Sequence, residues 1–430
     1  MANDHEADKS STKETQWSLQ DYLLVSLAML IKVGDGVEGY LPGVITQKVS
    51  CELGLSDFQE GVLAVVLIFF WTISILVSMP IANRLGERIT LFLSLYLSII
   101  FAVLCAFVPN YYTLLLSRAL TGICAGLNSS VTSIFLAKHV SSKDVLTKSS
   151  FLAESMSFAV GGTWVSVLGW LCLDIVGWRI FILLTSIPFF VPPILILHFC
   201  ISDKLVDGHE VEKESGTTNS IEPKETDGLV DSKSSESVPN FTARVIKSSL
   251  FAFSNLCIGY GSIILLPWLI RSYKEGLHED KCSEVVQGND FLILAAVTGA
   301  ANVIGRPLGY FLWSRVRFLI LQSSITVIMA LSYGIILTEP GLFAAELLLG
   351  AAKLCYSIQG VEVAQLYYDY DYYGKSRFEL GIGVTTFFGS IGCVVGTTLA
   401  AFLDPYRAVL TTLLIACMEL AVICFMKERF

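Results

Sequence analysis

LIKVGDGVEGYLPG, residues 30–43, places three charged side chains inside the first long apolar segment of this chain. Lys32, Asp35 and Glu38 are spaced three residues apart, so on a helix they share one broad face. Each such charge costs roughly 2.5–3.5 kcal/mol at the centre of a bilayer, and the apolar residues of the segment return only about 4–6 kcal/mol in total. We therefore predict that the charged face lines a protein interior or a water-filled cavity.

The sequence leaves two interpretations of this face open. In the first, Asp35 and Glu38 bind a proton or a cationic group, and Lys32 biases their charge state. In the second, Lys32 and Asp35 form an ion pair that only neutralises itself between packed helices, with Glu38 near the outer water. The first is favoured, because the stretch also contains residues that loosen a helix: Gly34, Gly36, Gly39, Pro42 and Gly43. Such a composition predicts an interrupted helix of the kind that lines binding sites in transporters.

Composition places the chain in a membrane. Of its 430 residues, 53% are hydrophobic and only 16% are charged, and the mean hydropathy is +0.64. Soluble domains carry about 25% charged residues. The apolar runs are about twenty residues long, the length of a transmembrane helix, and not the ten-residue alternating strands of a barrel. The expected fold class is therefore an all-α integral membrane protein, and no basic run predicts a nucleic-acid partner.

A hydropathy window of about nineteen residues predicts about twelve membrane-spanning helices. They lie near residues 21–45, 60–80, 90–109, 112–136, 147–172, 180–200, 247–270, 290–312, 317–337, 341–363, 379–402 and 406–426. Between the sixth and the seventh, residues 201–246 are rich in Ser, Glu and Lys, which predicts a flexible loop. The expected organisation is a tail (1–20), a six-helix half (21–200), the loop, a second six-helix half (247–426) and a short tail (427–430).

Positive charge predicts the orientation. Arginines and lysines gather in alternate connections, among them those holding Arg84, Lys138 and Arg315. The positive-inside rule then puts both termini and the central loop in the cytoplasm.

The eleven cysteines show no CxxC or Cys/His spacing, so no metal site is expected. Most fall inside apolar runs, where they act as small hydrophobic residues. Cys51 and Cys282 are the two placed in external connections. They are either free thiols, the favoured interpretation, or a disulfide that joins the two halves.

Similar connections follow the second helix of each half. The first, MPIANRLGERIT at residues 79–90, contains Arg84, Gly86 and Arg88. The second, GYFLWSRVRF at residues 309–318, contains Gly309, Arg315 and Arg317 in a weaker version of the pattern. A connection repeated at matching positions indicates a fold built from two related halves.

These connections resemble the loop motif of the major facilitator superfamily, with Met79 and Asn83 standing where the family has Gly and Asp. Arg118, Gly122 and Gly126 resemble its Arg-x-x-x-Gly-x-x-x-Gly pattern in the fourth helix. The resemblance covers essentially the whole chain. It implies two six-helix halves of pseudo-symmetric arrangement, in which the repeated connections take part in conformational switching.

Within this superfamily, Asp35-x-x-Glu38 resembles the branch of synaptic vesicle 2-related proteins and organic ion transporters (solute carrier 22-like). KCSEVVQGNDF before the eighth helix and KSRFELGIG at residues 375–383 resemble the same branch. The Pro-Glu-Ser-Pro-Arg motif of that branch is missing after the sixth helix, as is the large first external loop of organic ion transporters.

Further ionisable residues fall inside the expected helices: Arg118, Glu154, Arg306, Glu346, Lys353 and Glu419. Such groups are functional candidates when they face the protein interior. We expect Lys353 to face the cavity, where it would hold an anionic group or pair with an acid of the first helix. Arg118 and Glu154 are each assigned either a role in the site or a structural ion pair. Arg306 and Glu346 are expected near the membrane interface, and Glu419 is left unassigned.

The sequence thus predicts a secondary active transporter of a small organic ion or metabolite, working by alternating access with proton coupling. The expected substrate- and proton-binding residues are Lys32, Asp35, Glu38, Tyr40, Arg118, Glu154 and Lys353, with aromatic walls drawn from Phe69, Phe70, Trp71 or Tyr260. The alternatives are an uncoupled facilitator and a transporter-like sensor or vesicle membrane protein that binds ligand without moving it.

Enzymatic activity is not expected. The chain has no recognisable Ser/His/Asp set or phosphate-binding glycine loop, and its five histidines are dispersed. No cofactor or metal is predicted. The expected partners are the substrate, protons and the lipid of a plasma or vesicle membrane, with the protein acting as a monomer.

Overall fold

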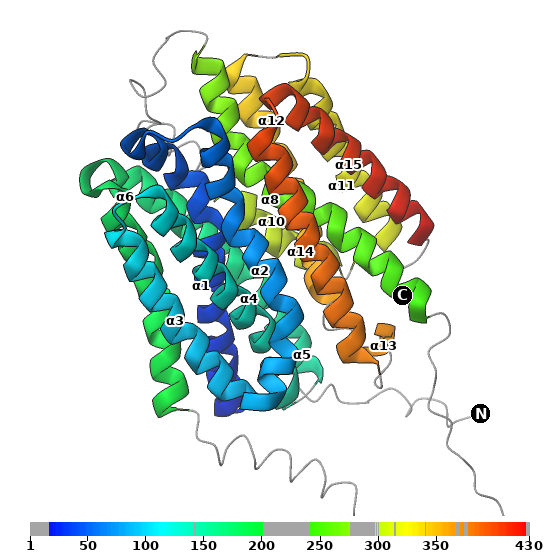
Figure 1. Cartoon of the computed structure of the whole chain (residues 1–430). Helices are drawn as coiled ribbons and strands as arrows, with labels where there is room; N and C mark the ends of the chain where they lie inside the picture. The colour runs from blue at the N-terminus through cyan, green and yellow to red at the C-terminus, as the bar shows by residue number, and fades with distance from the viewer. Residues whose placement is uncertain are drawn as a thin grey trace, which may run out of the picture.

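The computed structural model describes residues 17–141, 143–200, 241–275, 297, 299, 301–313, 315–339, 341–366, 370–373 and 377–426. Within these residues all regular structure is helical, which confirms the expected all-α fold class. The N-terminal half, coloured blue to green, lies beside the C-terminal half, coloured yellow-green to red (Figure 1). We call the end of the bundle where α1 begins the tail end, and the opposite end the far end.

The N-terminal half contains α1 (Leu19–Leu53), α2 (Asp57–Leu85), α3 (Glu87–Phe107), α4 (Tyr111–His139), α5 (Lys143–Ser150), the π-helix η1 (Phe151–Met156) and α6 (Ser157–Phe199). Short polar sequences set the turns between these helices. Ser18 and Ser56 form capping boxes at the starts of α1 and α2. Gly177, with a φ of 72°, divides α6 into the fifth and sixth expected helices.

The C-terminal half contains α8 (Phe241–Glu275), α10 (Ala301–Trp313), α11 (Phe318–Ile336), α12 (Leu342–Leu366), α13 (Tyr370–Tyr373), α14 (Phe378–Phe402) and α15 (Pro405–Met426). The helix α8 begins at Phe241, before residue 247 where the seventh helix was expected. Residues 201–240 of the expected central loop lie outside the described residues.

Nine helical segments of the described chain are long and apolar enough to cross a membrane. The prediction of twelve differs for three reasons. The three charges of α1 exclude it from the apolar set. The fifth and sixth expected helices count as one segment, because α6 runs through the kink at Gly177. The start of the eighth helix lies outside the described residues. The chain is a multi-pass membrane protein.

Close helix packing explains the glycine pattern of α4. A Cβ added at Gly122 or Gly126 would collide with the backbone of α2, at Leu67 and Trp71 respectively. The absence of side chains lets the two backbones approach, as small residues do between membrane helices.

Two features of the expected structure are wrong. The helix α1 runs without interruption from Leu19 to Leu53, with Pro42 inside it. The Thr46 hydroxyl donates to the Pro42 carbonyl at 2.6 Å, one turn along the continuous helix. Cys51 is disulfide-bonded and is not the free thiol that was favoured; its expected partner, Cys282, lies outside the described residues.

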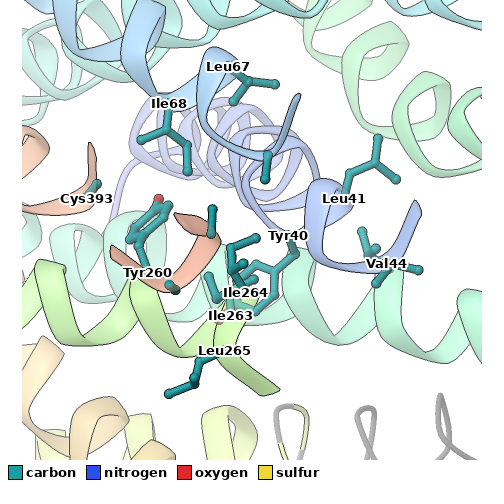
Figure 2. Close-up of a cluster of buried hydrophobic side chains, with 14 of the residues drawn as sticks. Tyr40, Leu41, Val44, Leu67, Ile68, Tyr260, Ile263, Ile264, Leu265 and Cys393 are labelled. Carbon is teal, nitrogen blue, oxygen red and sulfur yellow. The ribbon is translucent and has the colours of Figure 1, made fainter. Parts of the chain in front are cut away.

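The two halves meet through one continuous hydrophobic core built from residues of both. In Figure 2, Tyr40 of α1 lies beside Ile263 and Ile264 of α8, and Tyr260 of α8 points toward Ile68 of α2. The halves also touch at the far end. There the rings of Phe58 and Phe402 have centroids 5.7 Å apart, joining α2 to α14.

Candidate functional site

The face of α1 predicted to leave the lipid is buried in the protein. Lys32 is 4% exposed, Asp35 1% and Glu38 0%. The helix α1 lies between α4, η1 and α6, and it also contacts α8 of the other half. The prediction of a face turned into the interior is therefore met, and each of its three charges has a different environment.

Lys32 pairs with Glu154. Its Nζ lies 2.7 Å from Glu154 Oε1, and it donates to Ser129 Oγ at 3.0 Å and to Ser133 Oγ at 3.1 Å. Ser133 also donates to Glu154 Oε1 at 2.5 Å. The pair thus joins α1, α4 and η1, and the ion pair between Lys32 and Asp35 that the sequence allowed is not formed. Glu154 sits on a π-helical turn, a local irregularity common at functional sites.

Glu38 forms a structural ion pair with Arg118. Arg118 Nη1 lies 2.7 Å from Glu38 Oε2, and Ser186 donates to Glu38 Oε1 at 2.6 Å. Both charged side chains are buried, at 2% and 0% exposure. Neither lines the central cavity described below, so the structure does not place Glu38 and Arg118 with the candidate binding residues.

Asp35 is the charge of this face that the protein does not compensate. Neither of its carboxylate oxygens has a hydrogen-bond partner among the described residues. Asp35 lines a cavity of about 130 Å³ between the two halves. Burying a carboxylate without a donor is costly, so this position calls for a proton or a cationic group.

The central cavity has walls from both halves. Aromatic and polar side chains gather around it: Trp71, Thr72, Asn255, Tyr260, Arg306, Tyr356 and Ser390. Trp71 and Tyr260 were among the predicted aromatic walls. Phe69, another of them, is 46% exposed on the outside of the bundle and takes no part.

A second cavity of about 520 Å³ lies beside the first, on its tail-end side, and shares lining residues with it. Lys32 and Glu154 line both, so their ion pair lies where the two cavities join. The lining of the second cavity reaches Met79, Lys138 and Leu380, near the tail-end termini of α2, α4 and α14. The second cavity therefore gives the central site a route toward the tail end.

Arg306 is the cavity residue that the sequence prediction missed. It was expected at the membrane interface, yet it is 5% exposed. It lines the cavity from the C-terminal half, whereas Asp35 lines it from the N-terminal half. Its Nη1 donates to Ser155 Oγ at 3.2 Å across the two halves, and its guanidinium lies 5.6 Å from the Tyr356 ring centroid. No carboxylate pairs with it in the described part of the chain. The sequence did contain a signal for this position, because an arginine inside an apolar run is a candidate for a buried site. The uncertain boundary of the expected helix placed Arg306 near its end instead.

Lys353 and Tyr40 lie just behind the cavity wall. Lys353 Nζ donates to Gly259 O at 3.2 Å and Ser262 Oγ at 3.1 Å, and lies 4.7 Å from the Tyr356 ring and 5.5 Å from the Tyr40 ring. Tyr40 Oη accepts from Asn302 of α10 at 3.3 Å. These two residues join the halves, but they do not line the cavity.

The repeated connections hold helix ends together. Arg84 is exposed, Gly86 turns the chain with a φ of 88°, and Arg88 donates to Leu197 O at 2.9 Å. In the second half Arg315 stacks 4.0 Å over Phe311.

Two residues of the second connection differ in position from the motif. Gly309 lies inside α10, where an added Cβ would be 3.0 Å from Ile358 Cα, so it is a packing residue and not part of a connection. Arg317 is the residue that caps α11.

Comparison with known proteins agrees with this architecture. Residues 28–397 match the family model of the Major Facilitator Superfamily. The chain is 25% identical over 186 residues to synaptic vesicle glycoprotein 2A of Rattus norvegicus, covering 40% of this chain and 24% of that protein. It is 24% identical over 301 residues to the 4-hydroxybenzoate transporter PcaK of Acinetobacter baylyi, covering 64% and 65%.

A third relative is the putative transporter svop-1 of Caenorhabditis elegans, 28% identical over 159 residues, which cover 36% of this chain and 29% of that protein. The matches thus span about a quarter to just under two thirds of the relatives' lengths. The family model covers most of this chain, and its helical halves enclose a central cavity. We conclude that the chain belongs to the Major Facilitator Superfamily of membrane transporters.

Proposed function

We propose that the protein is a proton-coupled secondary transporter of a small organic anion with an aromatic or apolar body. Its central site would alternate between the two sides of the membrane as the halves rock against each other. The observation that carries the proposal is Asp35, a buried carboxyl group without a partner at the wall of a cavity between the halves.

Asp35 suits the role of proton carrier because the charged residues nearest to it on α1 already form ion pairs with other side chains. Lys32 is held by Glu154 and two serines, and Glu38 is held by Arg118. Asp35 can therefore gain or lose a proton without breaking an ion pair. When Asp35 loses its proton, a negative charge appears in the cavity wall and favours a different conformation. Binding and release of the proton are in this way coupled to the conformational change.

Arg306 favours an anionic substrate. It lines the cavity, lacks a carboxylate partner, and lies close to the ring of Tyr356. With Asp35 protonated and Lys32 neutralised by Glu154, the cavity retains the positive charge of Arg306. A carboxylate or sulfonate would satisfy that charge, and Trp71 and Tyr260 would pack against the apolar part of the substrate.

The structure represents one state of the proposed cycle, with access from the tail end. By the positive-inside rule, this end is cytoplasmic, and so are both termini. The proposed membrane is a plasma or vesicle membrane, in agreement with the name of the synaptic vesicle relative. The opposite state would require separation of Phe58 and Phe402 and closure around Met79 and Leu380.

A second candidate is a transporter-like protein that binds ligand without moving it. Met79 and Asn83 replace the Gly and Asp of the family's loop motif, and Arg84 is exposed beside them. A weakened switch loop would slow the conformational cycle while leaving the cavity intact.

The test uses purified full-length protein in liposomes, with three permanently charged or neutral probes built on one ring. Benzenesulfonate is the anion, benzyltrimethylammonium the cation and benzenesulfonamide the neutral control. Uptake is measured by mass spectrometry with and without an inward proton gradient, for wild type, Asp35→Asn, Arg306→Gln and the control Arg407→Gln. Arg407 is exposed and pairs with Asp404 at the protein surface.

We expect gradient-driven accumulation of benzenesulfonate that Asp35→Asn abolishes. Arg306→Gln should raise KM at least about tenfold, since a hydrogen bond to a charged group contributes about 1.5–3 kcal/mol. Accumulation of the cation alone would refute the anion assignment. Uptake that ignores both the gradient and Asp35 would identify a facilitator, and saturable binding without uptake would identify the sensor.

A further inference from the structure

The C-terminal half contains a second carboxyl group that is buried without a hydrogen-bond partner. Glu419 of α15 is 0% exposed, and neither of its carboxylate oxygens meets a donor with hydrogen-bond geometry among the described residues. The polar groups that face it are Ser254 and Asn255 of α8. Nothing in the proposed function so far uses this residue.

Asn255 has an unused acceptor. Its Nδ2 donates to Gln359 Oε1 at 3.0 Å, and Gln359 Nε2 donates to Thr326 Oγ1 at 3.2 Å. Asn255 Oδ1, by contrast, is buried without a partner. A chain of neutral hydrogen bonds therefore runs through α8, α12 and α11. It begins at Asn255, the residue that also faces Glu419.

Among the described side chains, no positive charge lies beside Glu419. The helix α15 packs against α8, α11 and α14. The titratable group of α8 beside Glu419 is the Cys257 thiol, which in turn faces Cys393 of α14. The buried polar side chains of α11 include the neutral Gln322 and Thr326.

Charged residues on the neighbouring helices lie farther along them. Lys247 precedes Asn255 by about two turns of α8, and Arg244 precedes it by about three. Lys353 of α12 is held at Gly259 and Ser262, one to two turns along α8 in the other direction. The remaining charges on α11, α14 and α15 lie at helix termini: Arg317, Arg377, Glu379, Asp404 and Arg407.

We propose that Glu419 is a second proton-binding site, which holds its proton by donating a hydrogen bond from the carboxyl O–H to Asn255 Oδ1. One proton then satisfies both the carboxyl group and the unused amide oxygen. The arrangement needs no cation, and it leaves the bond from Asn255 to Gln359 intact.

The site communicates with the central cavity because Asn255 also lines that cavity. An ionised Glu419 accepts hydrogen bonds only, so it would turn the Asn255 amide toward itself and break the bond to Gln359. The proton on Glu419 therefore fixes the cavity wall in the C-terminal half, as Asp35 does in the N-terminal half. This consequence rests on the proposed function, whereas the protonation itself does not.

Infrared spectroscopy tests the protonation directly. Full-length wild type, Glu419→Gln and the control Glu60→Gln are reconstituted in lipid nanodiscs, and the C=O stretch of protonated carboxyl groups is recorded at neutral pH. Glu60 is another buried carboxyl group, which accepts a hydrogen bond from Ser50 at 2.9 Å and does not line the cavity. Because no substrate is needed, the result is independent of whether the protein transports anything.

We expect Glu419→Gln to remove one protonated-carboxyl component that Glu60→Gln leaves unchanged. Asn255→Leu should move that component to the higher frequency of a carboxyl group without an acceptor. An unchanged spectrum in Glu419→Gln would overturn the proposal, and an unchanged frequency in Asn255→Leu would overturn the link to the cavity. If Glu419→Gln does not fold, Glu419→Asp replaces it: a shifted component supports the proposal and an unshifted spectrum refutes it.

Discussion

Lys32 of α1 pairs with Glu154 of η1 at 2.7 Å and not with Asp35, three residues along the same helix. This choice of partner leaves Asp35 with two unsatisfied oxygens at the wall of the central cavity. The chemistry of the site therefore depends on an ion pair that does not include its proposed proton carrier.

Replacing Glu154 by Gln removes the partner of Lys32 and leaves a buried positive charge. Breaking a buried pair from one side typically costs about 3–5 kcal/mol, and the 14% exposure of Glu154 places the expected loss at the lower end of that range. We also expect Lys32 to turn to Asp35 and reduce proton coupling. Thermal unfolding and gradient-driven uptake measure the two effects.

The control for this prediction is Arg407→Gln, which breaks an ion pair whose side chains are 74% and 51% exposed. Exposed pairs contribute about 0–1 kcal/mol, so its unfolding should match that of wild type. Equal stability of Glu154→Gln and wild type would show that Lys32 does not depend on Glu154.

The pair of Glu38 and Arg118 is expected to stabilise the fold without taking part in binding. A double-mutant cycle with Glu38→Gln and Arg118→Gln should give a coupling energy of about 1–3 kcal/mol, because each single variant leaves the other charge buried. The folded double variant should keep wild-type affinity for benzenesulfonate. Additive losses of stability, or a lost affinity in the double variant, would contradict this assignment.

The glycines of α4 give a test of packing. Gly126→Ala should lower the apparent Tm and the yield of folded protein, because the new Cβ would collide with the Trp71 carbonyl and the Ser74 side chain of α2. Gly334→Ala in α11 is the matched control, since an added Cβ there meets no atom within 4 Å. A similar Tm for the two variants would argue against close contact between α2 and α4.

The direction of access can be read from Cys393, a buried free thiol that lines the central cavity. A membrane-impermeant maleimide should label it from the tail end and not from the far end. Phe402→Ala removes the ring that packs on Phe58 and fills the space beside Gly61. That variant should gain labelling from the far end, measured by peptide mass spectrometry in oriented membranes.

Labelling of wild-type Cys393 from the far end alone would contradict the assigned state. Serine in place of Cys393 identifies the labelled peptide, since Cys200, Cys417 and Cys424 are also exposed thiols.

The fold and the charged face of α1 were predictable because the physics involved is local. Charges at spacings of three in an apolar segment exclude lipid on that face, whatever surrounds the helix. The same reasoning could not predict which side chains form ion pairs with these charges. Lys32 and Glu154 are far apart in the chain, and their pairing depends on how α1 packs on η1. A π-helical turn leaves no pattern in hydropathy.

Arg306 was misplaced for a related reason. Hydropathy locates helix ends only to within a few residues, and one turn decides whether a side chain lies at the interface or in a cavity. The prediction for α1 failed differently. Gly and Pro indicate a loosened helix, but packing against α6 and α8 keeps α1 continuous through Pro42.

Proton movement driven by substrate tests the central claim most directly. Liposomes containing wild type or Asp35→Asn and a trapped pH-sensitive dye are given an inward gradient of benzenesulfonate, with electrical potential clamped by potassium and valinomycin. The account predicts acidification of the interior by wild type. It predicts none by Asp35→Asn, which should still exchange labelled for unlabelled benzenesulfonate. Acidification by Asp35→Asn at the wild-type rate would contradict the assignment of Asp35 as the proton carrier.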